Sequence, residues 1–158
     1  MIFRVCQWLY SLSVSQTIRE ADLVFPVLEC IHLYSMVCLI TVIAMFDVRL
    51  MGFVRARVCQ PISQLAKLVM LLAWICFGVN AATGSFLFIS KATDYYANGA
   101  FRVKILLVFM GIVYHTVILR RKWDEEGMSM GAKLTGAFSL ALWIGVIGAS
   151  RWIAYADV

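Results

Sequence analysis

The sequence predicts an all-α integral membrane protein: an up-down bundle of four transmembrane helices, preceded by an amphipathic helix that lies at the membrane interface. Three observations support this. Of 158 residues, 63% are hydrophobic and 15% are charged, whereas soluble domains are about half apolar and a quarter charged. The apolar residues gather in four long blocks separated by short polar segments. Within lipid each block must satisfy its own backbone hydrogen bonds, as a helix does.

The first twenty residues are amphipathic, with Phe3, Trp8 and Tyr10 beside Arg4, and they predict an interfacial helix over residues 1–20. Two starts are open for the helix that follows. The letters TIRE at residues 17–20 match a capping box, which predicts a start near residue 18 and a kink at Pro26. Alternatively, Asp22 is the N-cap, and Pro26 then falls in the first turn, where proline is tolerated.

Four blocks are predicted to span the membrane, at about residues 23–48, 66–90, 100–120 and 132–155, all in one membrane domain, 1–158. Residues 23–46 carry one charge, Glu29, and residues 68–89 carry none. Either block can cross roughly 30 Å of hydrocarbon. The third block is uncharged over 105–119, so it reaches full length only with residues 101–104. The fourth, 134–150, continues past Arg151.

The net charge of +5 does not indicate nucleic acid, because the basic residues are scattered through the segments between blocks. They fit anchoring beside anionic lipid. Eight fall on one side of the predicted bundle: Arg49, Arg55, Arg57, Lys67, Arg120, Arg121, Lys122 and Lys133. Six fall on the other: Arg4, Arg19, Lys91, Arg102, Lys104 and Arg151. This excess predicts a cytoplasmic location for the first set, with both termini on the opposite side.

Ionisable side chains inside the spans are the candidate functional residues. Glu29 and His32 are three residues apart and share one face of the first span. Lys104 and His115 are eleven apart, about three turns, and share one face of the third. These two spans run in the same direction, so both pairs can point into the same interior. Asn80 and Thr83 in the second span are expected to bond across helices.

Two histidines from different helices can hold a haem b between them. We predict His32 and His115 as its axial ligands, with Glu29 orienting the His32 imidazole or relaying a proton. Lys104 or Arg102 would pair with the propionates. His32 lies about 14 Å along the first span and His115 about 21 Å along the third. Helix tilt, or an earlier start of the first helix, could absorb this mismatch of about one turn.

Other interpretations of the same residues are open. A di-iron bundle needs a second Glu-x-x-His motif and more glutamates, but Glu29 is the only glutamate within a span. Copper or zinc at the two histidines lacks a clear ligand set. In a haem-free protein the histidines would bond across helices and Glu29 would pair with Lys104.

The stretch "ATGSFLFISKATDYYANGAFRVKILLVFMGIVYHTVILRR", residues 82–121, resembles the bacterial haem-containing protoporphyrinogen oxidases, which belong with the small copper-resistance-D-type membrane proteins. In that group a histidine early in the first helix recurs, as does a lysine-led third helix ending in Tyr-His. The matching residues are His32, Lys104, Tyr114 and His115. The oxidases have further histidines near the end of their first helix, where this chain reads "AMFDVRLMG".

The segment "WLYSLSVSQTIREADLVFPVLECIHL", with "DVRLMG" after it, resembles a family of small four-helix bacterial membrane proteins of unknown function. This second likeness covers nearly the whole chain, whereas the oxidase likeness covers roughly half. Together they imply a bacterial inner membrane protein, and with the Lys/Arg count this makes both termini periplasmic. They imply a fold and a haem more strongly than an activity.

The leading hypothesis is a b-type cytochrome-like electron-transfer protein, or a subunit of a respiratory or photosynthetic complex. It would pass electrons between a partner redox subunit and membrane quinone, as a single chain or a homo-oligomer. One alternative is a porphyrinogen-oxidase-like enzyme, in which Lys104 and Arg102 grip the substrate carboxylates. The other is a haem-free structural or accessory subunit. No catalytic residue is assigned.

Overall fold

The computed structural model describes residues 2–53, 62–120 and 129–156. The four predicted spans are helices: α3 (Val24–Leu50), α4 (Ile62–Ser90), α6 (Gly99–Arg120) and α7 (Met130–Ala156). Each is long and apolar enough to cross a membrane. The helix bounds differ from the predicted spans by a few residues at most. The largest difference is at the start of α4, which begins at Ile62 rather than at residue 66. The predicted all-α membrane bundle is confirmed.

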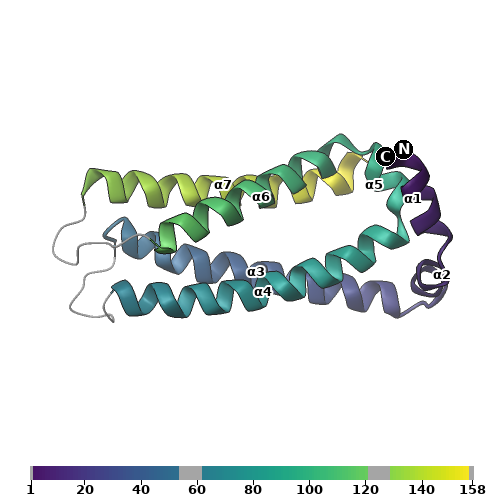
Figure 1. Cartoon of the computed structure of the whole chain (residues 1–158), viewed down its shortest axis with the longest axis horizontal. Helices are drawn as coiled ribbons and strands as arrows, with labels where there is room; N and C mark the ends of the chain where they lie inside the picture. The colour runs from purple at the N-terminus through teal and green to yellow at the C-terminus, as the bar shows by residue number, and fades with distance from the viewer. Residues whose placement is uncertain (1, 54–61, 121–128, 157–158) are drawn as a thin grey trace.

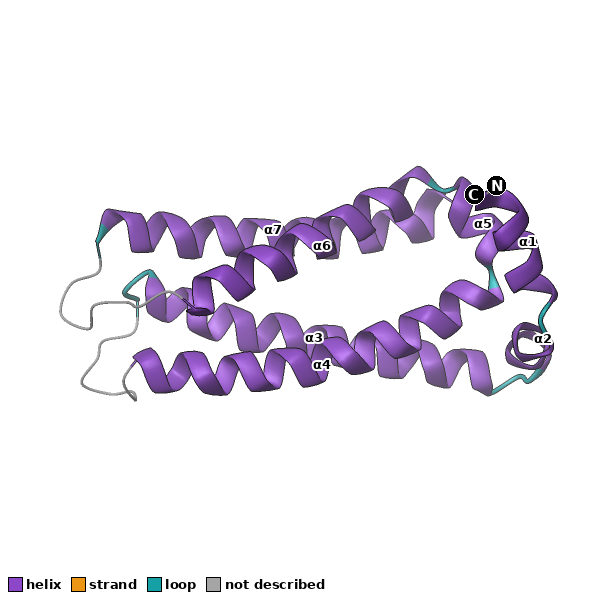
Figure 2. Ribbon diagram, in the orientation of Figure 1, coloured by secondary structure: helices purple, strands orange, loops and turns teal. Residues whose placement is uncertain are grey.

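The long helices lie as two pairs, α3 beside α4 and α6 beside α7, and they alternate in direction along the chain (Figures 1 and 2). Both termini lie at the same end of the bundle (Figure 1), as four spans require. That end also carries the three short helices of the described chain, α1 (Ile2–Ser11), α2 (Ser13–Glu20) and α5 (Ala92–Ala97).

The predicted single helix over residues 1–20 is in fact two helices, because the backbone at Leu12 is extended (φ −64°, ψ 144°). Arg19 stabilises the bend. Its Nη1 donates hydrogen bonds to Ser15 Oγ (2.6 Å), to the Tyr10 carbonyl (3.2 Å) and to the Ser90 carbonyl at the end of α4 (3.2 Å). The short helices are therefore bound to the end of the bundle.

Neither predicted cap begins the first span. Thr17 lies inside α2, where its hydroxyl donates to the Ser13 carbonyl (3.0 Å). The first residue of α3 is Val24, and Leu23 occupies the N-cap position without a side-chain cap. Pro26 falls in the first turn, where its missing N–H would have no helical partner in any case. The kink is thus absent, as the second alternative expected, but Asp22 is not the N-cap.

The apolar core fills only one half of the bundle, which we call the packed half. Its two clusters of buried side chains come from the C-terminal part of α3, the N-terminal parts of α4 and α7, and α6. One cluster contains Phe46, Leu50, Ile62, Ala66, Val69, Ile118 and Ala132. The other contains Met36, Leu39, Ile43, Ala73, Trp143 and Val146. The remaining half, next to the termini, contributes no described residue to either cluster, and we call it the open half.

Glycines bring the helices close together in the packed half. A Cβ at Gly136 of α7 would lie 2.8 Å from the backbone oxygen of Asp47 on α3. A Cβ at Gly111 of α6 would lie 3.3 Å from the Trp143 ring. Because lipid tails are as apolar as the side chains, close van der Waals contact of this kind, more than hydrophobicity, associates membrane helices.

Candidate functional site

His32 is held against α4 by a set of hydrogen bonds between the two helices. Its Nδ1 lies 3.1 Å from the backbone oxygen of Asn80 and 3.1 Å from Thr83 Oγ1. In return, the Asn80 side-chain amide donates to the His32 carbonyl (2.9 Å) and to Ser35 Oγ (3.1 Å). The prediction that Asn80 and Thr83 bond across helices is confirmed, and His32 and Ser35 are their partners.

These bonds determine which ring nitrogen of His32 carries the hydrogen. A backbone carbonyl can only accept, so Nδ1 must donate to Asn80. Thr83 donates its own hydroxyl hydrogen within α4, to the Val79 carbonyl at 2.8 Å, and its oxygen can therefore accept from Nδ1 as well. In the neutral ring, Nε2 then has the free lone pair. It makes no hydrogen bond with another described residue.

Gly84 makes room for the His32 ring. A Cβ at residue 84 would lie 2.9 Å from Cε1 of the imidazole and 3.3 Å from Nδ1, closer than side chains pack. The ring therefore lies directly over the backbone of α4. Sequence reasoning missed this role, although the glycine follows the hydrogen-bonding Thr83 in the chain.

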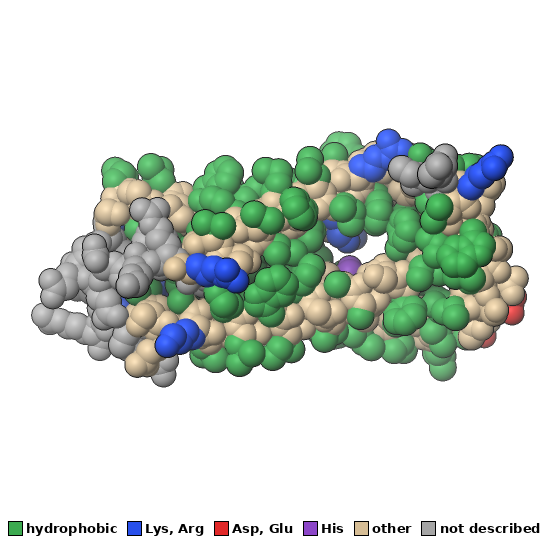
Figure 3. Space-filling view, viewed as in Figure 1, with side chains coloured by type: hydrophobic (Ala, Val, Ile, Leu, Met, Phe, Trp, Pro, Cys, Tyr) green, Lys and Arg blue, Asp and Glu red, His purple; other side chains and the backbone are tan. Residues whose placement is uncertain are grey.

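The open half contains a hollow between the two helix pairs. Figure 3 shows it as an opening in the surface, with a histidine and a basic side chain at its edge. Lys104 on α6 is half-buried and lies close enough to His32 for the two side chains to interact electrostatically. The structure thus brings together two of the predicted site residues, one from each helix pair.

Glu29 and Arg102 do not join them. Glu29 on α3 is exposed, and it makes no hydrogen bond or ion pair with another described residue. Arg102 is also exposed. Its Nη2 donates to the Tyr96 carbonyl (2.9 Å), and its guanidinium lies 5.2 Å from the centre of the Tyr96 ring. In this structure Arg102 therefore binds α5 rather than the hollow.

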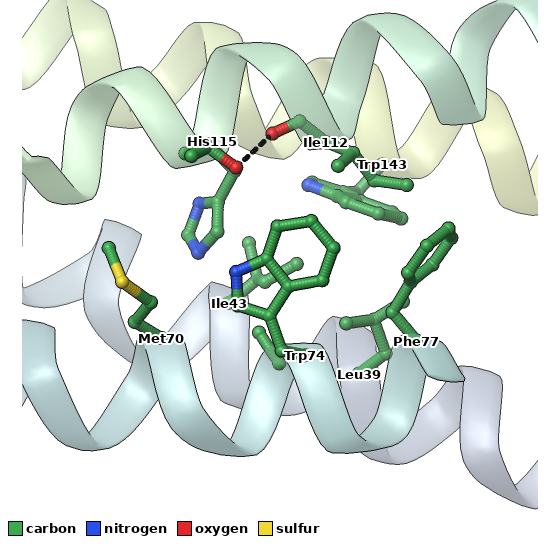
Figure 4. Close-up of a pocket in the computed structure, with 10 residues that line it drawn as sticks. Leu39, Ile43, Met70, Trp74, Phe77, Ile112, His115 and Trp143 are labelled. Atoms are coloured by element: carbon green, nitrogen blue, oxygen red, sulfur yellow. Dashed lines mark hydrogen bonds between the residues drawn. The ribbon is translucent and has the colours of Figure 1, made fainter. Parts of the chain in front are cut away.

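His115 lies in the packed half and is only 4% exposed. Figure 4 shows its imidazole in a pocket lined by all four long helices, with Met70, Trp74 and Trp143 around it. The Phe46 ring meets it edge-on, with ring centres 6.2 Å apart. Neither ring nitrogen makes a hydrogen bond with another described residue.

The two histidines lie at different depths. On α3, the ring that meets His115 edge-on is that of Phe46, fourteen residues after His32. Fourteen residues of helix measure about 21 Å. Two axial nitrogens on one metal are roughly 4 Å apart, twice a metal–nitrogen bond of about 2 Å. These helices therefore do not bring the two imidazoles to one haem iron, and the mismatch exceeds the single turn expected.

The described residues also test the interpretations in which the protein holds a metal ion without haem. They contain no group of three or more histidine, cysteine, aspartate or glutamate side chains that could hold a metal ion. Neither a di-iron centre nor a zinc or copper site of the usual composition is therefore found in that part of the chain.

No family model, curated protein or solved structure matches the chain. The resemblance to the haem-containing oxidases and to the small bacterial family therefore stays a prediction. The fold itself is a four-helix membrane bundle, in which His32 on α3 is bonded to α4 and His115 on α6 lines a pocket in the packed half.

Proposed function

We propose that the protein is a membrane-embedded b-type cytochrome whose haem would occupy the hollow in the open half, where His32 would bind its iron. The single observation that carries this proposal is the hydrogen bond from His32 Nδ1 to the Asn80 carbonyl at 3.1 Å. Histidines that bind metals are characteristically fixed in this way, with one ring nitrogen bonded to a carbonyl and the other directed at the metal.

The neighbouring residues fit such a group. Lys104 interacts with His32 from the opposite helix pair, and its ammonium would pair with a haem propionate. Gly84 lets the imidazole lie close to α4, where Asn80 and Thr83 hold its orientation. A haem bound there supplies a one-electron carrier. His115 is not used as the second ligand, because the Phe46 ring that it meets lies fourteen residues, about 21 Å, beyond His32 on α3.

The proposed cellular setting follows from the charge distribution and the resemblance. The eight basic residues on one side would face the cytoplasm of a bacterial cell, which makes both termini periplasmic. The connection between α4 and α6 is only residues 91–98, so on that side an electron would enter or leave through a partner redox subunit, a second copy of the chain or membrane quinone.

A visible spectrum tests the haem. Protein purified with ample iron and haem supply is expected to give a reduced-minus-oxidised spectrum of the b type. His32→Ala is expected to lose it, and imidazole added to that variant is expected to restore it by filling the vacated position. His115→Ala serves as the matched control and is expected to keep the spectrum.

Each result decides a separate point. Absence of b-type absorption in the wild-type protein would favour a haem-free accessory subunit, in which His32 only links α3 to α4. Haem retained unchanged in His32→Ala would contradict the ligand assignment. Loss of the b-type spectrum in His115→Ala but not in His32→Ala would instead place the haem site in the packed half.

A further inference from the structure

A second set of polar side chains is buried in the packed half, apart from the hollow. Asp47 on α3, Ser139 and Trp143 on α7 and His115 on α6 are each 4% exposed or less. Both Asp47 carboxylate oxygens, Ser139 Oγ, Trp143 Nε1 and both His115 ring nitrogens lack a hydrogen bond to any other described residue. Buried polar atoms nearly always have a partner in the protein or in water, so this set indicates bound water.

The four side chains follow one another through the bundle. The Ser139 hydroxyl lies beside the Asp47 carboxylate, although the two do not meet in hydrogen-bond geometry. Gly136, one turn before Ser139, holds α7 against the Asp47 backbone. Trp143 lies one turn after Ser139 and lines the same pocket as His115 (Figure 4). That pocket is partly open and has a volume of about 20 Å³, which is room for about one water molecule.

The chemistry of the set suits proton transfer. A carboxyl group and a hydroxyl group can each give and take a proton, and an imidazole can do so at either nitrogen. The Trp143 indole only donates, so it can hold a water in place without passing a proton on. Ionisable residues inside membranes characteristically mark proton relays.

Other polar groups around Asp47 come from its own helix and from its neighbours. Arg49 is buried on α3, whereas Lys67 of α4 and Lys133 of α7 are exposed. From α6, Tyr114 donates its hydroxyl to the Thr135 carbonyl (3.3 Å). Asp47 and His115 are thus the two groups of this set that can hold a proton in the interior.

We infer that Asp47, Ser139 and His115, with water held between them by Trp143, form a proton path across the packed half, from α3 to α6. A proton leaves the Asp47 carboxyl for the adjacent water or Ser139, and each water molecule or hydroxyl group passes one of its own protons onward until a His115 ring nitrogen accepts one. The products are an Asp47 carboxylate and a His115 imidazolium. No electron moves and the number of protons is unchanged.

Solid-state NMR of the full chain in lipid bilayers tests the path, with ¹⁵N-labelled tryptophan and histidine. In the wild type, magnetisation is expected to pass from water to the Trp143 indole N–H and the His115 ring at short mixing times. The Trp143 indole N–H is also expected to exchange with D₂O. A Trp143→Phe variant assigns the indole signal. No transfer from water to either side chain would show a dry cluster and overturn the inference.

Two substitutions at Asp47 distinguish the presence of bound water from the transfer of protons through it. Asp47→Asn keeps the shape of the site, so transfer from water should persist while exchange of the Trp143 indole slows at least about tenfold. Asp47→Leu should abolish both. Asp94→Asn, at an exposed aspartate of α5, is the control and should change neither.

Unchanged exchange in Asp47→Asn would overturn the role of Asp47. If the Asp47 variants do not fold, Ser139→Ala should slow exchange comparably, and an unchanged rate there would overturn the path.

Discussion

Side chains within the spans act through the partners that the fold gives them. Glu29 and His32 are only three residues apart, yet Glu29 is exposed and makes no bond to a described residue, while His32 is bonded to α4. The i, i+3 spacing correctly indicates that two residues are neighbours on a helix. It does not indicate which of them the adjoining helix will contact, and that contact distinguishes His32 from Glu29.

Gly84→Ala tests the position of the His32 ring. The new Cβ would lie 2.9 Å from Cε1, so the ring must move away from Asn80 and Thr83. We expect a loss of about 1–3 kcal/mol in the free energy of unfolding, as for overpacking elsewhere, together with weaker haem binding. Denaturant titration and the visible spectrum measure the two effects.

Gly78→Ala is the matched control on the same helix. No atom lies within 4 Å of the Cβ that it would add, and alanine favours a helix over glycine by up to about 1 kcal/mol. It should be neutral or stabilising. Equal behaviour of the two variants would contradict the close packing of His32 on Gly84.

At the scale of helices, the sequence predicts the long elements well and their details less well. Long uncharged runs predict helices α3, α4, α6 and α7 because lipid permits little else. The break at Leu12 and the short helix α5 carry no such signal, since they depend on bonds such as those from Arg19 to the end of α4. The depths of His32 and His115 depend on how far α6 slides along α3, and helical periodicity does not set this.

Gly136→Ala tests the contact between α3 and α7. Its Cβ would meet the backbone oxygen of Asp47 at 2.8 Å, and a backbone atom inside a helix cannot turn aside as a side chain does. We expect the helices to separate, with a loss of about 1–3 kcal/mol in unfolding free energy. Thermal unfolding in detergent measures it. Gly148→Ala, on the same helix with open space around its Cβ, should show no loss, and a similar loss there would argue against a specific contact.

For the whole molecule, four spans require both termini on one side of the membrane, as Figure 1 shows for the bundle. We expect protease-sensitive tags at the two ends to be cleaved from the same side, and from the periplasmic side if the proposed orientation holds. Cleavage assays on intact cells and on inverted vesicles measure this. Tags on opposite sides would contradict the four-span bundle, whereas two cytoplasmic tags would contradict only the orientation.

The uneven distribution of the core has a mechanical consequence. The two helix pairs are packed together along one half and separated by a hollow along the other. A rotation of one pair about the packed half therefore displaces His32 relative to Lys104 more than it displaces any residues near the pivot. Helix tilt changes with bilayer thickness, so the width of the hollow is coupled to the thickness of the surrounding membrane. The bundle has the geometry of a lever, and its moving end holds His32.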